Sequence, residues 1–165
     1  MKGFVFEELS YQNINTNHNE LVVYFSRKNY TKKVAFEIAN ATGADLLELK
    51  VEKNTSGISG FITCFFYGLF QKSMPTFAFE EDLERYEKVT VCTPIWVLGM
   101  SAPIRHFIRK ASGKLKNVEY VFTHFMDNDF AKVADEMDYI LNVQRKSLRT
   151  ICMKKGIVKK DEVIK

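Results

Sequence analysis

A short loop in the segment YFSRKNYT, residues 24–31, gathers side chains suited to binding an anion. The loop follows an apolar run and precedes a helical pattern, so backbone N–H groups and the positive end of the helix dipole would point into it. Its hydroxyl and cationic side chains are Ser26, Arg27, Lys28, Tyr30 and Thr31. The pattern indicates a phosphate site, and the alternative is an ordinary helix capped by a Ser or Thr hydroxyl.

The loop contains no glycine, although a tight cradle around an anion usually needs a residue with positive φ. Asn29 adopts the left-handed conformation more easily than most other non-glycine residues. We therefore expect Asn29 to take the place of a glycine.

A second loop, TPIWVLGMSAP at residues 93–103, contains Trp96, the only tryptophan of the chain. The loop follows a buried strand pattern, and Trp96 lies between Pro94 and Gly99 within it. Trp96 there either covers the core or provides a wall against which a flat aromatic ligand stacks. These residues alone leave both alternatives open.

Five strand patterns alternate with helical patterns along the chain. Apolar or alternating runs predict strands at residues 21–25, 47–51, 89–93, 118–122 and 148–153. Helices are predicted from Thr31 to Gly43, from Ser101 to Gly113, and from 127–129 to Leu141. This order predicts a doubly wound, parallel α/β sheet, which binds ligands beyond the carboxyl ends of its strands. The loops at 26–31, 93–101 and 123–129 should meet there.

Composition and charge exclude several functional classes. The 165 residues suit one domain, and the net charge of +4 combines a tail of +6 from residue 145 onward with a body of −2. No nucleic-acid motif accompanies the basic tail, and the apolar stretch 58–70 is too short to span a bilayer. Three widely spaced cysteines indicate neither disulfides nor a metal site. We expect a cytoplasmic protein without nucleic-acid or membrane partners.

Two segments together resemble the flavodoxin family. They are SRKNYT followed by KKVAFEIANATGADLLEL, and TPIW followed by the helix that begins at Ala102-Pro103. The connection between them, with Gly60, Phe66 and Pro75, is similar to that of short bacterial flavodoxin-like proteins. The resemblance runs from about residue 21 to 158. It implies a five-stranded parallel sheet with strand order 2-1-3-4-5.

The resemblance also implies that FMN is the cofactor. Its phosphate would lie in the first loop, with Ser26 and Thr31 at the matching hydroxyl positions, and its ring against Trp96. The full set of cofactor-binding residues that follows is Ser26, Lys28, Asn29, Tyr30, Thr31, Pro94, Ile95, Trp96, Val97, Gly99, His124 and Phe125.

The first and third loops depart from the family pattern. Lys28, Asn29 and Tyr30 replace a threonine, a glycine and a small polar residue, and the ring of Tyr30 would block the site if it turned inward. The third loop lacks a Gly-rich run, so His124 or Phe125 would have to close the far side of the ring.

The resemblance implies an FMN-binding electron carrier or flavin-dependent oxidoreductase. Its partner would be a redox protein or a small-molecule electron acceptor. The alternative is a flavodoxin-like module that has lost flavin and binds proteins.

The two ends of the chain differ from the family. Residues 154–165 are too short and too charged for the helix that usually follows the last strand, so we expect that helix to be short or absent. We divide the chain into an N-terminal extension, 1–19, and a flavodoxin-like domain, 20–165. The extension should cover the vacant sheet face, either in its own chain or exchanged within a homodimer.

Overall fold

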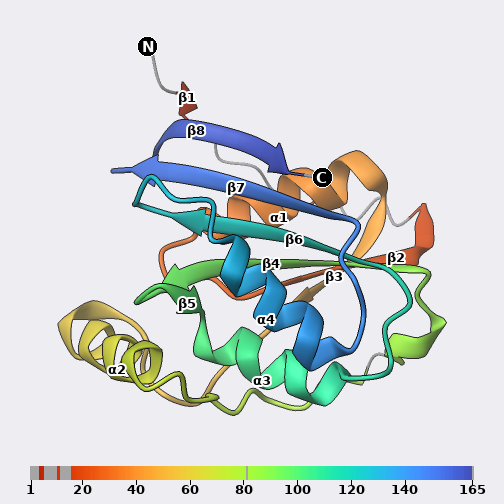
Figure 1. Ribbon diagram of the computed structural model, residues 1–165, viewed down its shortest axis with the longest axis horizontal. Coiled ribbons are helices and arrows are strands. Elements are labelled where there is room, and N and C mark those ends of the chain that lie inside the picture. Colours follow the sequence, from red (N-terminus) through yellow and green to blue (C-terminus); the bar gives the residue numbers. More distant parts are fainter. Residues whose placement is uncertain (1–3, 6–10, 12–15, 81, 165) are drawn as a thin grey trace.

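The computed structural model describes residues 4–5, 11, 16–80 and 82–164 (Figure 1). Its strands are β1 (Phe4–Val5), β2 (Asn17–Tyr24), β3 (Ala44–Glu48), β4 (Lys88–Trp96), β5 (Gly99–Met100), β6 (Val118–His124), β7 (Ser147–Lys154) and β8 (Ile157–Ile164). Its helices are α1 (Tyr30–Thr42), α2 (Gly57–Leu69), α3 (Ala102–Ala111) and α4 (Ala131–Leu141), with a short 3₁₀ turn at Leu83–Arg85.

The centre of the sheet has the predicted topology. Five parallel strands lie in the order β3-β2-β4-β6-β7, which is 2-1-3-4-5 in chain order. The chain moves from β2 outward to β3 and then crosses to β4 on the other side of β2. The direction of winding therefore reverses between β2 and β4, and a ligand site is expected at this point.

The sheet is wider than the five strands that the sequence predicted. β8 pairs antiparallel with β7, and β1 pairs antiparallel with β8. The missing final helix is thus confirmed for the described residues, but its sequence forms an edge strand instead. Apolar pairs at its two ends, 157–158 and 163–164, flank four charged residues. Arg149 on β7 holds the charged part through a two-pronged ion pair with Asp161 at 2.7 and 2.9 Å.

The extension contributes to the sheet at two places. Strand β2 begins at Asn17, so it includes residues 17–19, which the sequence analysis assigned to the extension. Sheet pairing with Ala44 outweighs the low strand propensity of asparagine there. The backbone of β1 extends the opposite edge. The prediction that residues 1–19 cover a sheet face falls mostly outside the described residues.

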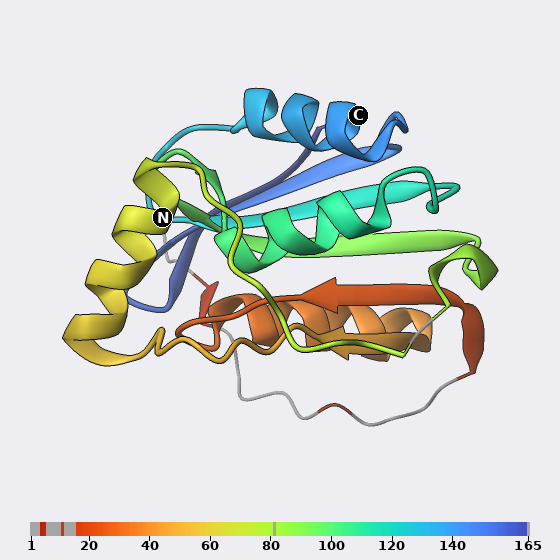
Figure 2. The ribbon, with the colours of Figure 1, turned by 90° about the horizontal axis from the view of Figure 1, so that it is seen from below.

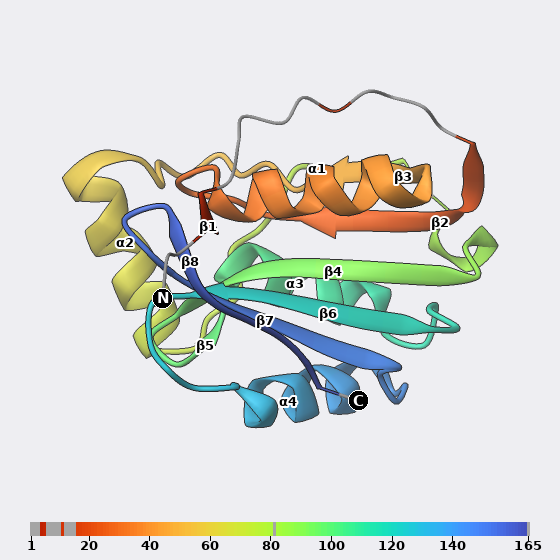
Figure 3. The same ribbon diagram turned by 90° about the horizontal axis from the view of Figure 1, so that it is seen from above.

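Helices cover both faces of the sheet. Alternate strand residues such as Leu21 and Val23 pack with α3 and α4, whereas Val22 and Tyr24 pack with α1. Figures 2 and 3 show α1 on the opposite side of the sheet from α3 and α4. The helix α1 ends as predicted at Gly43, which has φ of 69° and donates its N–H to the Ala39 carbonyl at 2.8 Å.

The sequence did not predict helix α2, which lies in the long connection between β3 and β4. It stands at one end of the sheet, outside the layers formed by the other helices (Figures 1 and 3). Only Gly60, Cys64 and Gly68 of this helix are buried. None of the helices among the described residues is long and apolar enough to cross a membrane.

Candidate functional site

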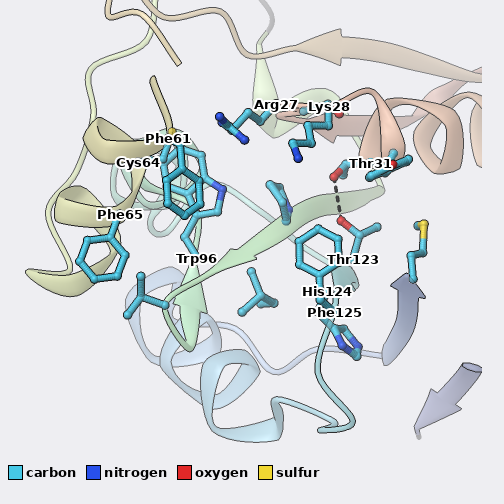
Figure 4. Close-up of a pocket in the computed structure, with 16 residues that line it drawn as sticks. Arg27, Lys28, Thr31, Phe61, Cys64, Phe65, Trp96, Thr123, His124 and Phe125 are labelled. Atoms are coloured by element: carbon cyan, nitrogen blue, oxygen red, sulfur yellow. Dashed lines mark hydrogen bonds between the residues drawn. The ribbon is translucent and has the colours of Figure 1, made fainter. Parts of the chain in front are cut away.

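A cavity of about 290 Å³ lies at the carboxyl ends of β2, β4 and β6, where the winding direction reverses. Its volume is near the lower end of the roughly 300–1,000 Å³ typical of ligand pockets. Its lining residues are Ser26, Arg27, Lys28, Tyr30, Thr31, Phe61, Cys64, Phe65, Pro94, Ile95, Trp96, Val97, Thr123, His124, Phe125 and Met153 (Figure 4).

The cavity contains ten of the twelve residues that the sequence proposed for the cofactor. The two that do not line it are Asn29 and Gly99. Asn29 instead sets the backbone conformation of the first loop, just before α1 begins. Gly99 is the buried first residue of β5, and a methyl group there would make only ordinary contacts with the protein at 3.6 and 3.7 Å. The surrounding protein atoms therefore do not require a glycine at this position.

The first loop has the backbone geometry of an anion site. Asn29 has φ of 63° and ψ of 0°, the left-handed conformation expected from the sequence, and it precedes the first turn of α1. The side chain of Asn29, the N-cap residue, makes no capping hydrogen bond to this end of the helix. The N–H groups of the first turn therefore lack the usual side-chain acceptor, and the helix dipole favours an anion there.

Ser26 presents a second unsatisfied group. Its hydroxyl oxygen is buried and has no hydrogen-bond partner among the described residues. A buried hydroxyl without a partner is unfavourable by about 1–3 kcal/mol, so such groups are usually satisfied by water or a ligand. Ser26 lies in the cavity, on the side where α1 begins.

The hydroxyl of Thr31 has a different arrangement from the one that the sequence suggested. It lies 2.8 Å from the hydroxyl of Thr123, and both side chains are almost fully buried (Figure 4). One hydroxyl donates in this pair, so the accepting hydroxyl still has a proton to donate. The pair joins the first and third loops across the floor of the cavity.

Tyr30 does not fill the cavity. Its ring belongs to the cluster that packs around α1, and it lies beside Gly156 in the β7–β8 turn. A methyl group added to Gly156 would lie 3.4 Å from the Tyr30 ring. This turn therefore accommodates the large side chain that replaces a small polar residue.

Two cations border the cavity on the side of the first loop. Arg27 donates from Nε to the Thr55 carbonyl and from Nη2 to the Gly57 carbonyl, both at 2.7 Å. It also lies over the Phe61 ring at 5.5 Å. Arg27 thus fastens the start of α2 to the first loop. The side chain of Lys28 is exposed, and no described hydrogen bond or ion pair engages it.

The second loop is a tight hairpin. Trp96 pairs with Gly99 across Val97 and Leu98, whose φ angles are 45° and 64°. Both central residues of a two-residue hairpin of type I′ require positive φ, and a β-branched residue such as Val97 rarely adopts it. The backbone is thus held in a strained conformation at the edge of the cavity.

Trp96 is mostly a core residue. Its side chain is only 8% exposed, and its ring packs edge-to-face on Phe25 with centroids 5.5 Å apart. A small part of it reaches the cavity. Of the two alternatives that the sequence left open, this burial favours core packing, since a stacking wall would present a full ring face.

His124 has a defined protonation pattern. Its Nδ1 lies 2.6 Å from the Met126 carbonyl, which can only accept, so Nδ1 carries the proton. Its Nε2 is buried without a described partner. Burial lowers the pKa of His124, with the Met126 hydrogen bond and Asp127 opposing and Lys160 adding to this effect. The imidazole is therefore neutral near pH 7, and its edge packs against Phe130.

The sequence did not assign six of the lining residues to the cofactor. They are Arg27, Phe61, Cys64, Phe65, Thr123 and Met153. Three of them come from α2, and the only signal for this helix is the small residues spaced by four at positions 60, 64 and 68. The acidic residues of the described chain do not line the cavity. The site is therefore apolar with a cationic, hydroxyl-bearing end.

Comparisons with known proteins agree on the fold. The chain matches no protein-family model and no curated protein sequence significantly. A flavoprotein from Lactobacillus acidophilus, solved in complex with FMN, superposes with a TM-score of 0.69 at 16% identity, covering 81% of this chain and 93% of its own. A protein from Bacteroides uniformis described as a flavoprotein superposes with a TM-score of 0.68 at 17% identity, covering 86% and 94%. The chain has the flavodoxin-like fold.

Proposed function

We propose that this protein binds FMN in the cavity and acts as a flavin-dependent oxidoreductase or electron carrier. The observation that carries the proposal is the unpartnered hydroxyl of Ser26 beside the uncapped start of α1. Both groups are hydrogen-bond donors, and both lie at the cationic end of an apolar cavity. A phosphate monoester linked to a flat aromatic ring matches that distribution.

The phosphate would be held by the first loop. The left-handed Asn29 turns the backbone so that the N–H groups of the first turn of α1 can converge on one anion. Ser26 adds a hydroxyl donor, and the Thr31–Thr123 pair has one proton to spare. The ammonium of Lys28 adds a charge that contributes favourably near a dianion.

The ring would be held by apolar side chains from three loops and α2. Ile95 and Val97 come from the second loop, and Phe125 from the third. Phe61 and Phe65 provide the wall from α2, which Arg27 fixes in place. Aromatic contacts of this kind contribute roughly 0.5–1.5 kcal/mol each beyond the area they bury.

FMN, when bound, would supply reversible one- or two-electron transfer to the site. The residues of this chain would position it, exclude water from one side and tune its potential. The cationic end of the cavity would stabilise the negatively charged phosphate of the bound cofactor. His124 would stay neutral, with its proton on Nδ1 hydrogen-bonded to the Met126 carbonyl. The electron donor and acceptor, whether a redox protein or a small molecule, would approach from the open side of the cavity.

Parallel titrations of the apoprotein with FMN and riboflavin test the proposal. FMN should bind at least about tenfold more tightly, since each tenfold corresponds to about 1.4 kcal/mol and the phosphate gains several donors. Ser26→Ala should narrow this preference while riboflavin affinity stays unchanged. Ser147→Ala, at the far end of the sheet on β7, is the matched control and should alter neither affinity.

Equal affinity for FMN and riboflavin would contradict the phosphate site. If neither flavin binds to the folded apoprotein, the flavin-free binding module is the better description of this chain.

A further inference from the structure

We propose that the outward face of α2 is the interface between two copies of this chain. This outer α2 face comprises Ile58, Phe61, Ile62, Phe65, Phe66, Leu69 and Phe70. The exposed fractions of these side chains range from 42% to 83%. Figure 1 shows α2 at one end of the sheet, on the far side of α3 from α4. The inference does not depend on whether flavin binds.

The spacing of these residues places them on one side of the helix. Each of them has another member of the set three or four positions away, the period of a helical stripe. Phe66 lies parallel to Phe70 at 6.2 Å between centroids, and Phe65 packs edge-on to Phe66 at 5.9 Å. The result is a continuous aromatic surface rather than scattered apolar side chains.

The helix cannot roll to bury this stripe in its own chain. A methyl group at Gly60 would lie 2.2 Å from the Thr55 carbonyl carbon, and one at Gly68 would lie 3.1 Å from the Trp96 backbone and side chain. The inward face of α2 therefore has no room for side chains larger than those it has. The large residues must point outward.

The exposed area is that of a stable interface. With roughly 200 Å² for each large side chain, the outer α2 face exposes on the order of 800 Å² at these fractions. The largest patch on a typical monomer is about 300–600 Å². A stable complex of standard size buries about 800 Å² on each partner. The seven side chains together reach that area, and about 600 Å² of it comes from the five that do not line the cavity.

The chemistry of the face fits a second copy of itself. Helix α2 contains no charged residue, and residues 53–79 contain no Asp or Glu. A neutral apolar face is compatible with itself and needs no charges of opposite sign on the partner. A two-fold symmetric dimer, the commonest assembly, brings together two such identical faces.

A lipid surface fits less well. Helices that lie on membranes have a polar face rich in Lys and Arg, whereas the other side of α2 is packed on the protein. The two flanking lysines, Lys53 and Lys72, lie over the Tyr67 and Phe70 rings at 5.8 and 5.7 Å.

The interface would adjoin the cavity. Phe61 and Phe65 belong both to the outer α2 face and to the cavity wall. The partner copy would therefore cover the outer side of this wall and shield it from water.

Sedimentation of the full-length protein over a range of concentrations tests the proposal. The mass should approach twice 19.1 kDa at micromolar concentrations. Ile62→Glu, which places a charge in the face outside the cavity lining, should weaken the dimer by at least about tenfold, or 1.4 kcal/mol. Tyr139→Glu is the control, because Tyr139 is 87% exposed on helix α4. It should leave the mass unchanged.

Disulfide trapping provides a second readout, because it detects the dimer directly as a covalent product and does not depend on a variant that weakens the interface. The three native cysteines are buried, so a new surface cysteine reacts alone. Oxidised Ile62→Cys should form a covalent dimer, and Tyr139→Cys should not. A monomeric mass at all concentrations without trapping would overturn the proposal. So would a monomer that co-sediments with anionic phospholipid vesicles through the same face.

Discussion

Replacing Gly60 with alanine should destabilise the protein, although the same change stabilises most helices. Alanine is favoured over glycine inside a helix by about 1 kcal/mol. Gly60 lies in the first turns of α2, where the helix packs on the preceding chain. Two effects of opposite sign therefore compete at this position.

The structure indicates which effect is larger. The new methyl group would lie 2.2, 2.6 and 2.8 Å from the carbonyl carbon, oxygen and Cα of Thr55. All three are backbone atoms, which cannot rotate away as a side chain can. Overpacking of this kind is typically unfavourable by about 1–3 kcal/mol. The Thr55 carbonyl also accepts the Arg27 hydrogen bond at 2.7 Å, which the shift would weaken. The weakened hydrogen bond, worth about 1 kcal/mol, offsets the helix preference for alanine, so the net loss should be about 1–3 kcal/mol.

Thermal unfolding followed by circular dichroism measures this loss. For a chain of this length 1 kcal/mol corresponds to about 2–4 °C, so Gly60→Ala should lower Tm by about 2–12 °C. Thr63→Ala, at a half-buried position of α2 away from Thr55, should change Tm little. A Gly60→Ala protein as stable as the original would refute the reasoning and show that α2 is free to shift away from Thr55.

Three further predictions concern the site and the chain end. Trp96→Ala should lower the free energy of unfolding by about 3–5 kcal/mol because the ring is core, as measured by urea titration; an unchanged stability with weaker flavin binding would restore the stacking role. The pKa of His124 should lie below its ordinary value of about 6.5, as read by NMR titration. Below pH 6.5 the folded protein then binds fewer protons than the unfolded protein, so the free energy of unfolding should fall as the pH falls below about 6.5. This fall should be less steep in His124→Gln. An equal dependence of stability on pH in both proteins would exclude His124 as its cause. Deleting residues 1–10 should lower Tm by several degrees, since it removes β1 from the edge of β8; a truncated protein with an unchanged Tm would show that these residues contribute nothing.

The local patterns of the sequence were sufficient for the parallel sheet. Continuous apolar runs can be buried on both faces, and three of the five predicted strands are followed by a recognisable helical pattern. The left-handed Asn29 and the helix end at Gly43 were predictable for the same reason, because both depend on the conformation of one residue. The flavodoxin-like strand order came from the resemblance and agrees with the observed pairing.

Helix α2 could not be recognised from periodicity. Its sequence has no charged residues and few polar ones, so it lacks the regular exchange of apolar and polar residues that marks a surface helix. A continuous apolar run of this kind is equally typical of a buried strand. Three of the cavity residues, Phe61, Cys64 and Phe65, were missed with it.

The conformation of each site side chain was decided by residues distant in the sequence. The Thr31 hydroxyl forms a hydrogen bond with the Thr123 hydroxyl, 92 positions away in the sequence. The Tyr30 ring lies beside Gly156, which has no side chain to displace it. The burial of Trp96 depends on Phe25 and on Gly68, and β8 forms because β7 leaves an edge that it can pair with. The sequence alone thus determined the elements and the loops that carry the chemistry, since these follow from short-range backbone preferences and hydrophobic period. Only the tertiary structure decided which hydroxyl stays unpaired, which ring is buried and which helix face remains exposed, because packing among distant residues sets those outcomes.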